Sequence, residues 1–152
     1  MIIVLQTILL AASLALVACQ QDRGPDIVIR DVEIYAPVAG SMMGVAYFVI
    51  DNNGGDLIVL EAARSPQFDA VEIHETRDED GVSRMRAVAS VDIPAGESAH
   101  FQPGGKHLML VGPGEGVGAG TSVTIELEHS AGLLLVSATM RDRLPTNPAR
   151  RD

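Results

Sequence analysis

Four side chains in this sequence could together bind a soft metal ion. They are His74, Met85, His107 and Met109, in the pattern His-x(10)-Met-x(21)-His-x-Met. A thioether is a soft, neutral donor that holds hard ions poorly and Cu(I) well, and an imidazole adds affinity without adding charge. The donor types therefore predict a Cu(I) site.

The spacing of the last two residues supports a shared site. His107 and Met109 lie in the stretch 106–111, where polar or soft side chains alternate with leucine. On a β-strand, both side chains would point to one face, with Cα atoms roughly 6.5–7 Å apart. Both could then reach a single ion.

The first two residues lie on either side of a turn signal. His74 ends an apolar alternation through Val71 and Ile73, and Met85 follows the pair Asp80-Gly81. Asp-Gly between two strand-like segments is typical of a β-hairpin. We expect this hairpin to bring His74 and Met85 together.

Each of these residues also has an ordinary interpretation. A methionine in a strand usually fills the core, and a histidine usually faces solvent or a hydrogen-bond partner. Met85, however, lies between Arg84 and Arg86, an unusual setting for a buried side chain. The combination favours metal binding, while a metal-free β-sandwich that binds a protein partner remains an alternative.

The elements that must position these residues are strands. Alternating apolar residues and Gly- or Pro-rich turns predict strands at 27–35, 45–50, 57–62, 70–74, 84–88, 106–111, 123–128 and 133–140. Sustained helical periodicity is absent from the sequence. Many short strands at this spacing are typical of an all-β sandwich in a single domain.

Several short motifs accompany the four candidate ligands. They are His74–Thr76, Gly81-Val82, Arg84–Arg86, Ile93–Gly96 and Pro103–Leu110. In these motifs the stretch 74–112 closely resembles the periplasmic copper chaperones called PCuAC. The similarity is weaker upstream, at 46–56, and covers roughly residues 27–140.

The resemblance implies both a fold and a function. The fold would be a cupredoxin-like Greek-key β-sandwich, with His74, Met85, His107 and Met109 holding one Cu(I) ion per chain. The protein would be a metallochaperone without catalytic activity that supplies the binuclear copper centre of cytochrome c oxidase, or another copper acceptor. Copper buffering at the cell envelope is an alternative use of the same site.

The chain departs from the PCuAC pattern in two places. A Gly-rich loop at 112–120 replaces a segment that in the family more usually contains Leu and Lys. The tail at 141–152 contains neither His nor Met, whereas some members carry a His- and Met-rich extension that takes Cu(II). We therefore expect no second copper site in the tail.

The N-terminal residues predict the compartment. Residues 1–18 form an uncharged apolar leader that ends in Leu16-Val17-Ala18-Cys19, which resembles a bacterial lipobox. Cleavage would leave Cys19 as the lipidated first residue, with 19–26 as a tether, 27–140 as the copper-binding domain and 141–152 as a flexible tail. The expected location is the periplasmic face of a bacterial membrane; plain secretion and an uncleaved anchor are alternatives.

Composition narrows the range of functions. Cys19 is the only cysteine, so the folded domain has no thiolate for a blue-copper site. Methionine and histidine ligands do not crosslink in an oxidising compartment, as a thiol pair would. The net charge of −9 argues against nucleic acid as a partner.

Other candidate residues are weaker. Met42 and Met43 could form an accessory thioether pair, but packing in the core or a loop is the simpler explanation. His100 and His129 are expected to be exposed loop histidines. We find no Ser, His and Asp grouping and no Gly-rich phosphate loop that would indicate catalysis.

Overall fold

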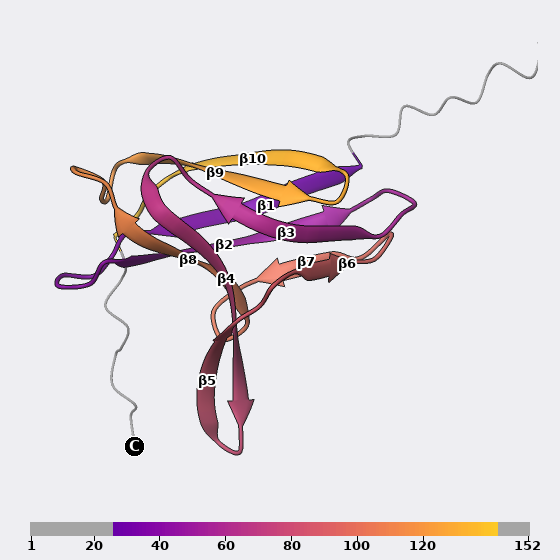
Figure 1. Ribbon diagram of the computed structural model, residues 1–152, viewed down its shortest axis with the longest axis horizontal. Helices are drawn as coiled ribbons and strands as arrows, with labels where there is room; N and C mark the ends of the chain where they lie inside the picture. The colour runs from indigo at the N-terminus through magenta and orange to yellow at the C-terminus, as the bar shows by residue number, and fades with distance from the viewer. Residues whose placement is uncertain (1–25, 143–152) are drawn as a thin grey trace, which may run out of the picture.

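The computed structural model describes residues 26–142, and all regular elements in that range are β-strands (Figure 1). No helix in this part of the chain is long and apolar enough to cross a membrane. The leader at 1–18, Cys19 and all of the expected tether except Asp26 lie outside the described residues, as does the tail beyond Asp142.

Ten strands follow one another along the described chain. They are β1 (Ile27–Tyr35), β2 (Met43–Asn52), β3 (Ile58–Arg64), β4 (Phe68–Glu79), β5 (Val82–Ala87), β6 (Val91–Ile93), β7 (Ser98–Phe101), β8 (Lys106–Pro113), β9 (Ser122–His129) and β10 (Gly132–Thr139). The all-β class is therefore as predicted.

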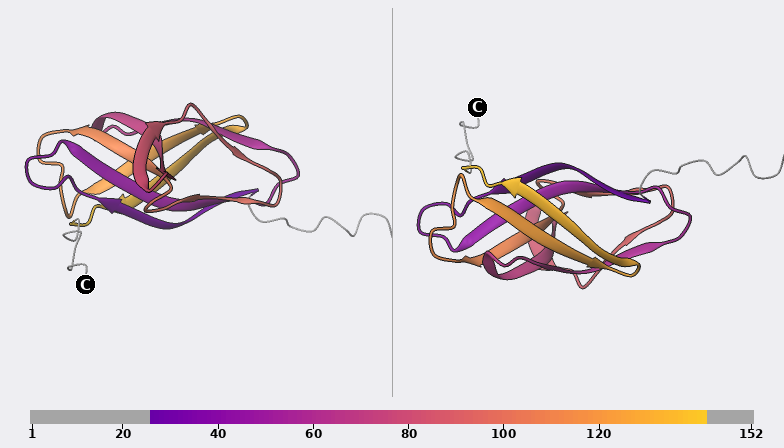
Figure 2. Two further views of the ribbon diagram at one scale, coloured as in Figure 1. Left: turned by 90° about the horizontal axis from the view of Figure 1, so that it is seen from below. Right: turned by 90° about the horizontal axis from the view of Figure 1, so that it is seen from above.

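The strands pair in the order β1-β2-β7-β8-β4-β3-β9-β10, with β5 added to β4 and β6 added to β3. The sheet curls into two layers whose strands cross at an angle (Figure 2). A bridge between Tyr35 and Arg141 joins the two ends of this order, so the sandwich is nearly a closed barrel. Arg141 is thus paired with β1, although the sequence places the start of the tail there.

The core lies between the layers. Alternating side chains point inward, and Val123, Ile125 and Leu127 on β9 are fully buried. Phe48 and Phe101 stack with their ring centroids 4.4 Å apart. Burial of each such large apolar side chain contributes about 1.5–3 kcal/mol, which makes β2, β7, β8 and β9 a rigid support.

The strands differ from the sequence prediction in number and in several of their boundaries. β6 and β7 were not predicted, because strands of 3 and 4 residues are too short to establish an alternation. β2 begins at Met43 rather than Val45, and β4 continues from His74 to Glu79. The extension of β4 arises because β5 supplies hydrogen-bond partners beyond the edge of the core.

The hairpin of β4 and β5 projects from the body of the sandwich (Figure 1). Its two-residue turn contains Asp80 at φ 56° and Gly81 at φ 78°, the left-handed pair of a type I′ turn. The predicted hairpin is confirmed, and Glu79 faces Val82 at its tip.

Candidate metal site

The four candidate ligands lie on three adjacent strands. In the pairing of β4 with β8, His74 is opposite His107 and Glu72 is opposite Met109. In the pairing of β4 with β5, Met85 is opposite Thr76, two residues from His74. Because opposed residues share a face of the sheet, all four side chains project from one face.

That face is turned away from the hydrophobic core. Ile73, Leu108 and Leu110 alternate with the candidate ligands and are 5%, 0% and 0% exposed. Their burial fixes the register of β4 and β8, because a slip by one residue would expose the core side chains. The same packing therefore holds the two histidines and Met109 on the outer face.

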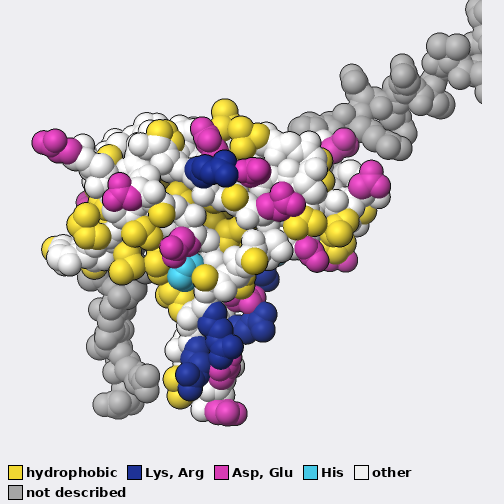
Figure 3. Space-filling view, in the orientation of Figure 1, with side chains coloured by type: hydrophobic (Ala, Val, Ile, Leu, Met, Phe, Trp, Pro, Cys, Tyr) yellow, Lys and Arg dark blue, Asp and Glu magenta, His cyan; other side chains and the backbone are white. Residues whose placement is uncertain are grey.

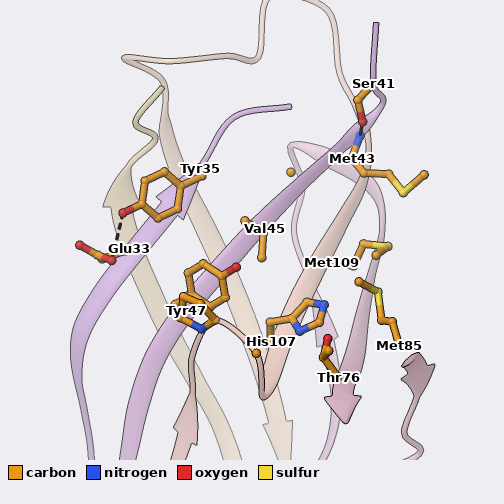
Figure 4. Close-up of a pocket in the computed structure, with 13 residues that line it drawn as sticks. Glu33, Tyr35, Ser41, Met43, Val45, Tyr47, Thr76, Met85, His107 and Met109 are labelled. Atoms are coloured by element: carbon orange, nitrogen blue, oxygen red, sulfur yellow. Dashed lines mark hydrogen bonds between the residues drawn. The ribbon is translucent and has the colours of Figure 1, made fainter. Parts of the chain in front are cut away.

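Three of the four candidate ligands line one open cavity of about 600 Å³. These are Met85, His107 and Met109, and Figure 4 shows the two thioethers pointing toward one another beside the imidazole. The rest of the lining is Glu33, Tyr35, Ser41, Met43, Gly44, Val45, Tyr47, Thr76, Pro103 and Gly104. The cavity is much larger than one ion, so it leaves room for another molecule's side chains.

His74 lies beside this cavity and outside its lining. Its ring centroid is 6.0 Å from that of His107. Its Nε2 lies 2.8 Å from a carboxylate oxygen of Glu72 and donates a hydrogen bond to it, so Nδ1 is the nitrogen left to bind a metal ion. Nδ1 is buried and has no hydrogen-bond partner. A buried nitrogen without a partner is costly, and a metal ion would satisfy it.

His107 is oriented in a similar way. Its Nδ1 donates to the carbonyl oxygen of Gly105 at 3.1 Å, and the side chain is buried with 6% exposure. The ring of Tyr47 lies 6.4 Å from it, centroid to centroid. Metal-binding histidines commonly anchor the second ring nitrogen on a carboxylate or carbonyl in this manner. The donor set therefore fits a soft ion.

Ion pairs stiffen the opposite face of the hairpin. Arg77 and Lys106 both contact Glu75, and Arg84 and Arg86 both contact Glu79. Lys and Arg side chains visibly gather there (Figure 3). Burial alone would raise the pKa of the Glu75 carboxyl, but hydrogen bonds from Lys106 and Arg77 bring it below its ordinary value.

This arrangement explains the position of Met85 between two arginines. Residues that alternate along a strand point to opposite faces, so Arg84 and Arg86 join the ion pairs while Met85 points to the cavity side. Met85 is 52% exposed. It is therefore not a core residue.

At the cavity wall formed by β1, Tyr35 donates a hydrogen bond to Glu33 at 3.0 Å, and Arg141 contacts the other Glu33 oxygen at 2.9 Å. Burial, together with the Glu33 carboxylate, raises the pKa of the Tyr35 hydroxyl above its ordinary value. Tyr35 therefore stays neutral at ordinary pH and acts as a hydrogen-bond donor in this wall.

Two expectations about other residues need correction. Met42 lies in the loop before β2, as one of the expected settings, whereas Met43 begins β2, is 48% exposed and lines the cavity, so Met43 packs in neither the core nor a loop. His129 lies in β9 with only 8% exposure, and its Nδ1 accepts a hydrogen bond from the Ala131 backbone N–H. His100 is exposed, as expected, but it lies in β7 and not in a loop.

Sequence reasoning also missed Tyr47 and Thr76 as residues of the cavity. Tyr47 follows Met43 and Val45 at intervals of two on β2, so strand alternation from Met43 onward would have identified this face. The signal was hidden because the apolar pattern alone starts the strand at Val45.

Comparisons with known proteins show which family this chain belongs to. The family model described as "Putative lipoprotein LpqE-like" matches residues 27–138. A protein of Leifsonia xyli subsp. xyli named "Putative lipoprotein Lxx21020" is 32% identical over 99 residues, which cover 64% of this chain and 60% of the relative. The match thus spans less than two thirds of that relative's length.

Two solved structures have the same fold. The copper-bound PCuAC domain from PmoF2 is 20% identical with a TM-score of 0.64, covering 80% of this chain and 97% of that domain. The solution structure of CuI-DR1885 from Deinococcus radiodurans is 25% identical with a TM-score of 0.65. The match covers 83% of this chain and 85% of that protein. The predicted cupredoxin-like Greek-key sandwich is therefore confirmed, and the chain belongs to the LpqE-like family, which is a PCuAC family.

Proposed function

We propose that this protein is an extracytoplasmic metallochaperone that binds one Cu(I) ion through His74, Met85, His107 and Met109. It delivers the ion to the binuclear copper centre of cytochrome c oxidase and catalyses no reaction. Copper is the cargo of this protein and not a resident cofactor.

The observation that carries the proposal is the convergence of soft donors on one face. Met85, His107 and Met109 line one cavity, and the buried Nδ1 of His74 lies beside it without a hydrogen-bond partner. Two thioethers and two neutral imidazoles are donors that suit Cu(I) and hold Mg²⁺ or Ca²⁺ poorly.

Two relatives support the choice of metal. PmoF2 has a PCuAC domain whose structure is titled copper-bound, and the DR1885 structure is titled CuI-DR1885. The first likeness supports the fold and the second, at 25% identity, also supports the oxidation state. Delivery to an oxidase rests on the PCuAC resemblance.

Release follows from the chemistry of the donors. Thiolate is a stronger donor for Cu(I) than thioether or imidazole, so transfer to an acceptor with reduced cysteines is energetically downhill. The half-exposed Met85 and the open cavity let acceptor cysteines replace the ligands one at a time. The domain itself contributes no thiolate, because the only cysteine is Cys19.

We place the protein at the periplasmic face of a bacterial membrane, anchored by a lipid on Cys19. In this proposal residues 1–18 are removed, 19–26 tether the domain at 27–140, and 141–152 form a tail. The family description and the Leifsonia relative's name both contain the word lipoprotein, which supports an envelope location.

Direct transfer tests the proposal. The full chain in detergent is loaded with Cu(I), separated from free ion and mixed with the reduced copper-site domain of an oxidase subunit. We expect the wild type to hold one Cu(I) and to pass it on, and Met109→Leu to bind more weakly while remaining folded. Tight binding without transfer would instead favour copper buffering; absence of tight binding would refute both.

Growth of a deletion strain separates chaperone from buffer. Loss of a chaperone lowers oxidase activity when copper is scarce, whereas loss of a buffer impairs growth when copper is abundant. An oxidase defect that copper supplementation corrects is the expected result.

A further inference from the structure

We infer that Met43 is an additional Cu(I) ligand at the mouth of the cavity, which accepts the ion on entry and holds it on exit. This inference rests on the proposed Cu(I) binding and adds a residue outside the His-x(10)-Met-x(21)-His-x-Met pattern. Met43 would thus be a transfer ligand in rapid exchange with the inner site, and the bound ion would contact its sulfur for part of the time.

The register of β2 places Met43 next to the proposed ligands. β2 pairs with β8, with Met43 opposite Val111 and Val45 opposite Met109. Met43 and Met109 are therefore diagonal neighbours on one face, at a separation of roughly 7–8 Å between backbones. Two flexible thioether side chains at this separation can both reach an ion between them.

The side chains confirm that this face is shared. Met43, Met85 and Met109 all line the same cavity, and Figure 4 shows their three sulfur atoms in succession along it. They come from β2, β5 and β8, which are remote in the sequence. Only the fold brings them together.

The exposures form a gradient from solvent to the interior. Met43 is 48% exposed and Met85 is 52% exposed, whereas His107 is 6% exposed. Met109 lies between these extremes as a half-buried residue. An ion that enters the cavity thus meets thioethers before it reaches the buried imidazole.

An exposed methionine at this place is not explained by packing. Core methionines are buried, as Met140 is at 1% exposure, and Met43 has no such role. Its backbone N–H donates a hydrogen bond to the Ser41 hydroxyl at 3.1 Å, which anchors the start of β2. The side chain is therefore held at the cavity mouth by an ordered backbone.

The chemistry favours an extra neutral donor at the entrance. Cu(I) exchanges ligands most readily when an incoming donor binds before the outgoing donor leaves, because the ion then never passes through a poorly coordinated state. A third thioether supplies that incoming donor without adding charge. It lowers the barrier for entry and exit equally and changes the final affinity little.

Met42 provides a matched control. It has the same side chain, is adjacent in the chain and is 59% exposed, but it does not line the cavity. We therefore compare Met43→Leu with Met42→Leu in the full chain in detergent. Leucine keeps the apolar volume and removes the sulfur.

Two readouts test the inference. Stopped-flow mixing of the Cu(I)-loaded protein with a coloured Cu(I) chelator gives the transfer rate, and competition at equilibrium gives the affinity. Titration of protein labelled with ¹³C in the methionine methyl groups, using Ag(I) as a redox-stable analogue, reports which sulfurs contact the ion. The methyl signal that is missing from the spectrum of each leucine variant identifies the signal of Met42 or of Met43.

We expect transfer from Met43→Leu to be slower by about tenfold, a barrier change of about 1.4 kcal/mol. Its affinity should stay close to that of the wild type, Met42→Leu should behave as wild type, and the Met43 methyl signal should shift with Ag(I). An unchanged transfer rate for Met43→Leu, or a stationary Met43 methyl signal, overturns the inference. Failure of the wild type to bind Cu(I) would instead refute the proposed function.

Discussion

His74 and His107 lie directly opposite each other across β4 and β8, with ring centroids 6.0 Å apart. Each ring donates one hydrogen bond to a residue two positions earlier in the chain. His74 donates to the Glu72 carboxylate and His107 donates to the Gly105 carbonyl oxygen. The two imidazoles are thus oriented before any ion binds. Such preorganisation reduces the entropy cost of binding.

Substitution Glu72→Gln tests this orientation. The amide can still accept a hydrogen bond from His74 but no longer carries the negative charge that strengthens this bond. We expect Cu(I) affinity to fall by about tenfold, at the lower end of the effect of such supporting residues. Competition with a Cu(I) chelator measures it.

A control for Glu72→Gln is Glu61→Gln, which removes an exposed carboxylate from β3, outside the cavity lining. Both variants lower the net negative charge by one. An equal loss of affinity in the two would mean that general electrostatics, and not the contact with His74, accounts for the effect.

Substitutions of Met85 and Met140 should distinguish an effect on Cu(I) binding from an effect on the stability of the fold. Met85 is 52% exposed and Met140 is 1% exposed. We expect Met85→Leu to weaken Cu(I) binding with a change of less than about 0.5 kcal/mol in the free energy of unfolding. Met140→Ala should cost about 2–5 kcal/mol because it leaves a cavity in the core.

Urea denaturation of the metal-free proteins, paired with Cu(I) competition on the folded ones, makes this comparison. A Met85→Leu protein with unaltered Cu(I) affinity would remove Met85 from the proposed ligand set.

Gly112 should be intolerant of a side chain. Its φ is 62°, and an added Cβ would lie 2.9 Å from Cβ of Asp69 on the neighbouring strand β4. Gly116 has a similar φ of 75° but open space around it. We expect Gly116→Ala to cost about 1 kcal/mol from backbone strain alone, and Gly112→Ala to cost clearly more.

Thermal denaturation of the two alanine variants tests the difference. Equal melting temperatures would show that the strand pairing at Asp69 adjusts without cost.

Asp51 should contribute a pH-dependent part of the stability. It accepts hydrogen bonds from Arg30 at 2.7 Å and from Ser98, which link β1, β2 and β7. These hydrogen bonds lower the pKa of the Asp51 carboxyl below its ordinary range, and the bond from Arg30 has the larger effect. A depressed pKa in the folded state adds stability above the unfolded pKa of about 3.9, which is lost as pH falls through the folded value.

We therefore expect Asp51→Asn to be less stable than the wild type at pH 7, with the difference shrinking below about pH 4. Urea denaturation of both proteins at a series of pH values from 7 downward measures this difference in stability. A difference that stays constant down to the lowest pH would assign the effect to the hydrogen bonds alone and not to the charge.

The sequence was sufficient for the all-β class and for the turn at Asp80-Gly81. Both depend on short-range effects: the alternation of apolar side chains and the left-handed backbone that Asp and Gly tolerate. The shared face of His107 and Met109 was predictable for the same reason, because two residues at an interval of two on one strand must point the same way.

Only the tertiary structure decided which strands became neighbours. Met43 lies on the same cavity as Met109 because β2 pairs with β8, and His74 lies opposite His107 because β4 pairs with β8. Local patterns specify which face of a strand is apolar, but not which distant strand completes the sheet. That choice depends on burying the whole core at once, which also buries His129 and leaves Met43 at the cavity mouth.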